Sequence, residues 1–251
     1  MRYRPIKISC LDGSERQFVY GASRIALCQE EAGAPGRDYL YNQRGLDVET
    51  VAQFRLGFVP FFLGHPFAGR VVFPVFDSHD KLIALSVRPI ADEPSIQKYW
   101  NESFPKGEHL YGLNLAKYHI ALMDFVIVVE GQVDVLQLHG NGLRNTVGIM
   151  GGSFTPLHAH LLKKWTRNFV FMMDGDDAGD KHAERAKEVL EVYRQVNKSA
   201  RSSRLCVSCV KLERGEDPAS YVMRFGGRKL RAVVSGAMSS VGMRPPERWK
   251  R

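Results

Sequence analysis

Acidic residues crowd the end of one apolar segment, in the stretch FMMDGDDAGD at residues 171–180. Asp174 and Asp176 are two residues apart, so both side chains can point the same way at the end of a strand. Like charges this close repel each other, and removing them from water is costly unless a cation lies between them. The stretch therefore marks either a solvated helix start or part of a metal site.

Two further acidic residues follow other apolar segments. Glu130 comes directly after FVIVV at 125–129, and Asp217 lies in GEDP at 215–218. A set of carboxylates without His or Cys favours Mg²⁺ or Mn²⁺. Such ions stabilise the attacking and leaving oxygens of phosphoryl transfer. We therefore predict a metal site composed of Glu130, Asp174, Asp176 and Asp217.

Other interpretations of the acidic run are a calcium site, a phosphatase site and a helix cap. An EF-hand would need oxygen ligands where the chain has Ala178 and Arg185. A dehalogenase-type phosphatase normally carries its aspartate pair early in the fold, whereas this pair lies late in the chain. Asp177 could serve only as the N-cap of the following helix.

Strand and helix patterns alternate through the region that contains these acids. Such alternation predicts a parallel sheet with helices on its faces, which binds ligands at the carboxyl ends of its strands. The predicted acidic site lies at those ends. Strands are expected at 125–131, 145–152, 167–176 and 203–212, with helices at 132–142, 155–165 and 178–196.

The first 120 residues predict a smaller, mixed α+β region. Residues 1–30 are weakly patterned, and a Gly-Pro-Gly loop is expected around Pro35. A hairpin is expected over 69–90, because two apolar runs flank a polar turn at 77–80. Two short helices are expected, one at 39–43 capped by Asp38, and one capped by Asp47 with the apolar stripe Val48, Val51 and Phe54.

The charge of the chain is uneven. Its 251 residues have a formal net charge of +8. The segment from residue 219 to the end contains eight basic residues and one acidic residue, so it carries a local net charge of +7. Such an excess favours a polyanionic partner such as a nucleic acid. The longest apolar run, at 125–129, is far too short for a membrane span, and the first 13 residues lack the apolar core of a secretory signal.

The four cysteines favour a reducing compartment over a disulfide framework, so a cytoplasmic protein is expected. Cys206 and Cys209 have a metal-like spacing, but in a strand residues i and i+3 face opposite ways. No zinc is therefore expected in this chain.

Four blocks of sequence then resemble, in order and spacing, the Toprim domain of bacterial DnaG-type primases. Three upstream blocks look like the N-terminal part of the primase RNA polymerase core, and these matter because topoisomerases and nucleases also contain Toprim domains. The resemblance covers roughly residues 37–225. The Toprim blocks are FVIVVEGQVDVLQLHGNG, VGIMGGSFTPLHAHLL, FVFMMDGDDAG and GEDP, and the upstream blocks are YLYNQRGLDVETVAQFRLGFVP, GRVVFPVFDSHDKLIALSVRP and KYWNESFPKGEHLYGL.

The resemblance implies roles for individual residues. Glu130 matches the catalytic glutamate, and the predicted metal aspartates match the metal-binding aspartates of the family. Catalysis is thus expected from Glu130, Asp174 and Asp176. Arg70, Arg88 and Lys98 match basic residues that the family uses near nucleotide and template. Asp134 matches the aspartate one helical turn after Glu130 and is expected with them among the cofactor-binding residues. Tyr99 and Trp100 could either stack on bases or pack within their loop.

The resemblance also implies an activity and partners. A DNA primase would make short RNA primers on single-stranded DNA from ribonucleoside triphosphates, with a replicative helicase as a primosome partner. The usual N-terminal zinc module is not seen in the sequence, so a separate zinc module is an expected partner. Such a chain resembles a minimal primase core from a phage or mobile element, in a bacterial or phage-infected cell, or a piece of a larger system.

Two departures from the family pattern keep other functions open. Ala219 stands where the family usually has a second aspartate, and Gly151-Gly152 replaces its Gly-Thr turn. The alternatives are another Toprim enzyme such as a nuclease, or a non-catalytic nucleic-acid-binding subunit. The predicted division is an N-terminal core subdomain at 1–120, a Toprim catalytic subdomain at 121–220 and a basic helical tail at 221–251.

Overall fold

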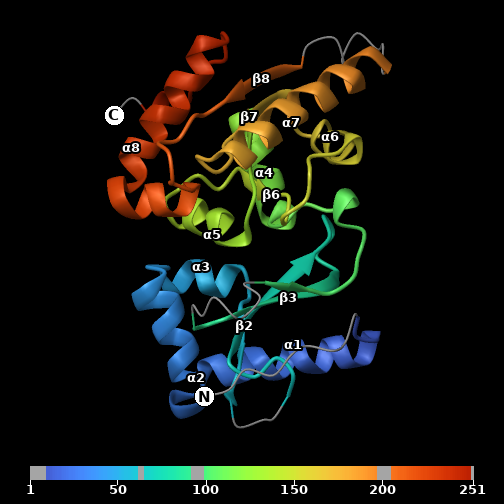
Figure 1. The fold of residues 1–251 in the computed structure, drawn as a ribbon, viewed down its shortest axis with the longest axis vertical. Coiled ribbons are helices and arrows are strands. Elements are labelled where there is room, and N and C mark those ends of the chain that lie inside the picture. Colours follow the sequence, from blue (N-terminus) through green and yellow to red (C-terminus); the bar gives the residue numbers. More distant parts are fainter. Residues whose placement is uncertain (1–9, 62–64, 92–98, 197–204, 250–251) are drawn as a thin grey trace. The chain divides into compact units, whose positions relative to one another are not determined.

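The computed structural model describes residues 10–61, 65–91, 99–196 and 205–249. It forms two compact units, residues 1–104 and 105–251, each with its own four-stranded sheet (Figure 1). The predicted α/β class, with a parallel sheet in the later part of the chain, is confirmed. The predicted boundaries at 120 and 220 do not coincide with this division.

The first unit contains an antiparallel sheet in the order β1-β2-β3-β4. The predicted hairpin is formed by β2 and β3, which pair from Arg70↔Pro89 onward. In its turn, Asp77 Oδ1 accepts hydrogen bonds from the backbone N–H groups of His79 and Lys81. The strands are β1 Gly57–Val59, β2 Arg70–Phe76, β3 Leu82–Pro89 and β4 Trp100–Asn101.

Four helical segments accompany this sheet, and one of them, α2, replaces a predicted loop. The expected loop around Pro35 is helical, because Gly33 packs against the backbone carbonyls of Ala26 and Leu27, where a Cβ would collide. Close packing of this kind outweighs the poor helix propensity of glycine. The segments are α1 Gly13–Cys28, α2 Glu30–Arg37, the π-helix η1 Asp38–Gln43 and α3 Val48–Gln53.

The two predicted caps have different outcomes. Asp47 caps α3 as expected, since its side chain accepts the N–H of Thr50. Asp38 does not begin a new helix, because the helical segment continues from α2 and its carboxylate accepts from the side chains of Asn42 and Gln43. In the predicted stripe, Val51 and Phe54 are buried, but Val48 is 66% exposed, so its place in the stripe was wrong.

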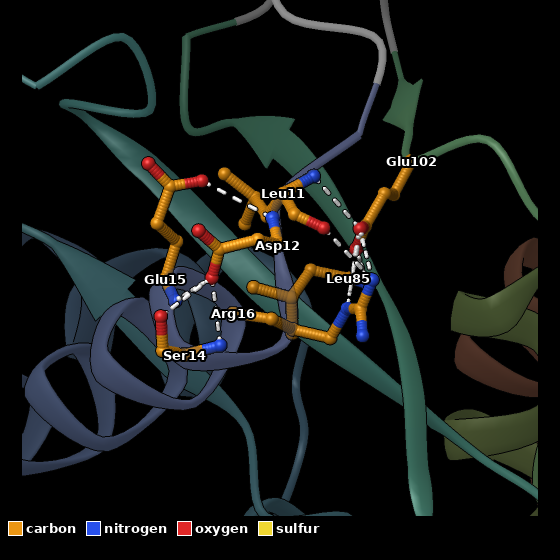
Figure 2. Close-up of polar contacts among 7 residues, drawn as sticks. All are labelled: Leu11, Asp12, Ser14, Glu15, Arg16, Leu85 and Glu102. Carbon is orange, nitrogen blue, oxygen red and sulfur yellow. Dashed lines mark hydrogen bonds and ion pairs between the residues drawn. The ribbon is translucent and has the colours of Figure 1, made fainter.

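The helix α1 was missed by the sequence analysis, although its start carries a recognisable signal. Asp12 and Glu15 form a capping box, in which each side chain accepts a backbone N–H of the other residue (Figure 2). The same region contains an ion pair between the buried Glu102 and Arg16, whose side chain is 21% exposed. Glu102 also accepts the N–H groups of Leu11 and Leu85, so one buried carboxylate joins the chain before α1 to β3.

The second unit contains a parallel sheet in the order β6-β5-β7-β8. All three strand pairs are parallel, as the strand–helix alternation predicts. β5 is entirely buried, which fits its uninterrupted apolar sequence. The strands are β5 Val126–Val129, β6 Thr146–Gly148, β7 Asn168–Phe171 and β8 Cys206–Cys209.

Helices cover this sheet and contribute to its apolar core. Thr155 caps α6 and Pro156 is its first residue, as predicted. The helical segments are η3 Lys106–Glu108, α4 Leu113–Met123, α5 Gln132–Gly140, α6 Pro156–Leu162, α7 Asp177–Val196, α8 Pro218–Ser240 and η5 Glu247–Trp249.

The C-terminal region is packed against this unit. In α8, Leu230, Val234 and Met238 are buried. Trp249 packs edge-on against Phe125, with ring centroids 5.5 Å apart. The predicted basic tail is therefore helical but belongs to the second unit. Within the described residues, no helix combines the length and apolar character that a membrane crossing needs.

Candidate active site

Glu130 and Asp174 lie at the same edge of the parallel sheet. β5 and β7 are neighbours, and Glu130 follows the end of β5 while Asp174 follows β7. Glu130 Oε1 accepts the backbone N–H of Asp174 at 3.3 Å, and Glu130 Oε2 accepts Nδ1–H of His182 at 2.9 Å. The glutamate that the sequence analysis identified thus lies against the acidic loop, held by two separate donors.

The acidic loop turns directly into α7. Asp176, not Asp177, caps this helix, since its Oδ1 accepts the N–H of Gly179 at 2.7 Å. Asp177 is the first helical residue, and its exposed side chain pairs with Arg214 at 3.1 Å. A glycine is needed at 179 because a Cβ there would collide with the backbone of Asp174.

Asp217 reaches the same edge from the segment after β8. Its side chain caps α8 by accepting the N–H of Ser220 at 2.6 Å. The preceding loop is bound to the acidic loop, because Gly175 N–H donates to the carbonyl of Glu216 at 2.7 Å and Gly215 N–H donates to that of Gly175 at 3.0 Å. The three predicted metal aspartates therefore lie in two loops that are hydrogen-bonded to each other.

Asp134 is the buried member of the acidic group. Its carboxylate accepts the N–H of Gly131 at 3.0 Å and the N–H of Ala219 at 3.1 Å, so it joins the starts of α5 and α8. Burial, and then the negative charges of Asp217 and Asp174, raise the pKa of Asp134 to about 7. These charges act on one another only because the three carboxylates are close.

The residues fit a hard divalent cation in their chemistry. Within the described part of the chain, no three His, Cys, Asp or Glu side chains form a group that could hold a metal ion. Asp176 and Asp217 each use one carboxylate oxygen, Oδ1, as a helix cap, and a metal site shared by all four carboxylates stays a prediction. Magnesium usually takes only one or two carboxylates and keeps several waters, so this oxygen-rich edge suits it.

The acidic loop also lines a polar pocket of about 340 Å³, to which it contributes Asp174 and Gly175. Basic side chains in the lining are Lys187, Lys211 and Arg214. Arg214 already pairs with two acids, Asp177 and Asp180, at 3.1 Å each. Positive charge thus lies close to Asp174 within the second unit.

The predicted nucleotide-binding arginines are mostly buried within the first unit. Arg70 is 5% exposed and donates to the carbonyls of Pro66 and Ala68. Arg88 is 6% exposed, donates to the Tyr99 hydroxyl and lies over the Tyr99 ring at 5.1 Å. Lys98 lies outside the described residues. A role of these three residues toward nucleotide stays a prediction.

The aromatic residues near them take part in packing. The Trp100 ring lies 4.8 Å from Phe67, and the Tyr99 ring lies 6.1 Å from Phe73. Both side chains keep some exposure. These contacts agree with the prediction that Tyr99 and Trp100 pack within their loop.

His182 is the site residue that sequence reasoning missed. It contacts Glu130 although the two residues are 52 positions apart. Nothing in its local sequence marks it, since a lone histidine on an amphipathic helix has many ordinary roles. The usable signal is indirect, because α7 starts at the end of β7 and its first turns must therefore pass the acidic edge.

Comparison with known proteins agrees with this geometry. Residues 124–200 match the family described as Toprim domain. Residues 62–117 match the DNA primase catalytic core, N-terminal domain. The two matches follow one another in the chain, so the order of the sequence blocks is that of a primase core.

Curated relatives are DNA primases. That of Aquifex aeolicus (strain VF5) is 35% identical over 175 residues, which are 68% of this chain and 33% of the relative. That of Pseudomonas putida is 38% identical over 173 residues, which are 67% of this chain and 25% of the relative. The chain thus spans a third or less of the length of these relatives.

Solved structures give the same fold. The E. coli primase catalytic core has a TM-score of 0.75 at 28% identity, covering 88% of this chain and 79% of that one. The DnaG primase catalytic domain bound to ssDNA has a TM-score of 0.74 at 27% identity, covering 88% and 77%. The Aquifex aeolicus primase with its zinc-binding and RNA polymerase domains has a TM-score of 0.72 at 27% identity, covering 90% and 62%. The chain belongs to the DnaG-type DNA primases and has their catalytic-core fold, with a Toprim domain built on its parallel sheet.

Proposed function

We propose that this chain catalyses template-directed synthesis of short RNA primers on single-stranded DNA, as a primase-type nucleotidyltransferase. The observation that carries the proposal is the contact between Glu130 and the loop of Asp174, beside Asp134 and Asp217. Primase relatives that match both units of the chain support the same activity.

In this proposal the acidic edge handles the reacting phosphates. Glu130, Asp174 and Asp176 are the catalytic residues, and Asp217 is a further metal ligand. Asp134 supports the site by accepting the N–H groups of Gly131 and Ala219. A bound Mg²⁺ or Mn²⁺ would stabilise negative charge on the triphosphate and on the attacking 3′ oxygen. The chain itself positions the carboxylates by capping two helices and holding Glu130 at both oxygens.

The partners of the proposed activity follow from the substrate. Arg70, Arg88 and Lys98 would neutralise phosphate charge on nucleotide and template. A primase catalytic domain has been seen bound to ssDNA, and another solved primase combines zinc-binding and RNA polymerase domains. The second of these structures supports a separate zinc module as a proposed partner. A replicative helicase is proposed only from the resemblance to primases.

The test is primer synthesis from labelled ribonucleotides on single-stranded DNA, with and without an added zinc-module protein. Asp174→Ala should abolish incorporation, because it removes a ligand that the transition state needs. The same change should leave DNA binding nearly intact and should not lower the melting temperature without Mg²⁺, since it removes one charge from a repulsive cluster. The exposed Glu188→Ala, on the outside of α7, is the matched control.

Each alternative function has its own result in this assay. Shortening of end-labelled template without primer synthesis would identify a nuclease. Template binding without either reaction, even with the zinc module, would identify a non-catalytic subunit, which Ala219 in place of the family aspartate permits. A clear drop in melting temperature for Asp174→Ala would make this residue structural.

A further inference from the structure

Both oxygens of the Glu130 carboxylate are held, and by different elements. Oε1 accepts the backbone N–H of Asp174 after β7, and Oε2 accepts Nδ1–H of His182 in α7 at 2.9 Å. The Glu130 side chain is 16% exposed, so these two donors replace most of its water. A carboxylate held at both ends has one orientation, and its remaining lone pairs point in fixed directions.

The position of His182 is itself fixed by the start of α7. Gly179 donates its N–H to Asp176, and it packs so closely on the backbone of Asp174 that a side chain there would collide. His182 follows Gly179 by three residues and therefore lies on the same face of the helix. That face is turned toward the acidic edge, and the imidazole is only 33% exposed.

We propose that His182 is a positioning residue for metal binding by Glu130. It orients the carboxylate through Oε2 so that the free lone pairs of Glu130 face a bound Mg²⁺ or Mn²⁺. This inference rests on the proposed function, because it takes Glu130 as a metal-binding carboxylate. Hydrogen-bond partners of metal ligands typically contribute about 10–100-fold to metal affinity.

The donor geometry of His182 suits this role better than that of a lysine would. The imidazole offers one N–H to one oxygen in a fixed plane, whereas a lysine in its place would bring a mobile ammonium that competes with the cation. A carboxylate with a directed N–H donor at one oxygen keeps its charge available to a metal. The contact therefore orients Glu130 and leaves lone pairs on both carboxylate oxygens for a metal.

The experiment measures Mn²⁺ binding by calorimetry or paramagnetic resonance, without nucleotide or DNA. His182→Ala removes the donor and should raise the Mn²⁺ dissociation constant about tenfold or more. His182→Asn should recover most of the affinity, because its amide nitrogen branches from Cγ as Nδ1 does. The neighbouring exposed Lys181→Ala is the control for a general change of charge, and should leave the constant unchanged or slightly lower it.

Three results would overturn the inference for a folded variant. An Mn²⁺ affinity of His182→Ala within twofold of the unsubstituted chain would show that the contact does not matter. Equal weakness of His182→Asn and His182→Ala would show that the donor is not the cause. Absence of Mn²⁺ binding by the unsubstituted chain would also overturn it. If His182→Ala fails to fold, His182→Gln, whose amide is one bond farther away, takes its place and should bind more weakly than His182→Asn.

Failure of the proposed function would look different. A chain that binds Mn²⁺ through this contact but makes no primers leaves the inference standing and removes primase activity. If primers are made, the Mg²⁺ concentration for half-maximal synthesis should rise in His182→Ala, while kcat at saturating Mg²⁺ should change little. A fall in kcat with unchanged Mg²⁺ dependence would place His182 in another role.

Discussion

The buried Asp134 makes the stability of the protein depend on pH in an unusual direction. Its pKa is raised from 3.8 to about 7, chiefly by burial and then by the charges of Asp217 and Asp174. In the unfolded chain the carboxyl loses its proton near pH 4, whereas in the folded chain it keeps the proton until about pH 7. The folded state therefore binds more protons over this window, and its stability falls as pH rises through it.

The size of the effect follows from the two pKa values. The difference between 3.8 and about 7 corresponds to about 4 kcal/mol, fully lost above pH 7. Asp134→Asn cannot ionise, so the variant should lack this pH dependence. The asparagine side chain has one acceptor oxygen in place of two, so it loses one of the two hydrogen bonds from Gly131 and Ala219. This loss lowers the free energy of unfolding by about 1–3 kcal/mol at every pH. The variant should thus be less stable than the parent near pH 5 and as stable or more stable near pH 8.5.

The assay is urea unfolding at these two pH values in EDTA, followed by circular dichroism. The exposed Glu188→Gln, also in the second unit, is the control and should follow the parent at both pH values. Adding Mg²⁺ should stabilise the parent most at the higher pH, where the acidic group is fully charged. Parallel pH profiles for the parent and Asp134→Asn would refute the reasoning, because the ionisation of Asp134 would then cost the fold nothing.

Two other predictions concern the rest of the chain. Arg16→Met should destabilise the first unit by about 3 kcal/mol, because Glu102 would keep a fully buried charge without its ion-pair partner. Thermal melting measures this. Arg16→Met with Glu102→Gln should recover part of the loss, because the amide carries no charge and its oxygen can still accept one of the N–H groups of Leu11 and Leu85. Equal melting of the single and double variants would show that the pair is not the cause. Replacing the exposed Arg228, Lys229 and Arg244 with Gln should flatten the salt dependence of single-stranded DNA binding, by up to about 2 in the log–log slope. An unchanged slope would exclude these residues from DNA contact. Substitution is preferable to deletion of residues 244–251, because the deletion would also remove Trp249, which packs on Phe125.

The parts of the fold that could be predicted from sequence are those whose signals are local and strong. The run FVIVV has no polar position, so it had to be a strand buried on both faces, and Glu130 had to follow at its end. The same reasoning placed Asp174 at the end of β7. Parallel pairing then brings the two residues together without any further information.

The parts that were missed depend on contacts between distant segments. Gly33 and Gly36 are typical of loops, yet both lie in the helix α2. Glycine is needed there because a Cβ at Gly33 would collide with α1 and a Cβ at Gly36 would collide with Phe58. The helix α1 has a capping box but buries few apolar residues, so its periodicity is weak. His182 reaches Glu130 across 52 residues, and no local pattern predicts that contact.

The acidic edge also shows that closely spaced carboxylates can have a second role besides metal binding. Without a cation, its carboxylates stabilise helix starts, since Asp176 and Asp217 cap α7 and α8, and Asp134 accepts from the starts of α5 and α8. Helix starts carry partial positive charge, which offsets part of the repulsion. The offset is incomplete at Asp134, where the pKa remains raised. Mg²⁺ binding should therefore relieve the repulsion that remains at Asp134 and add to the stability of the folded chain, which thermal melting with and without Mg²⁺ can measure.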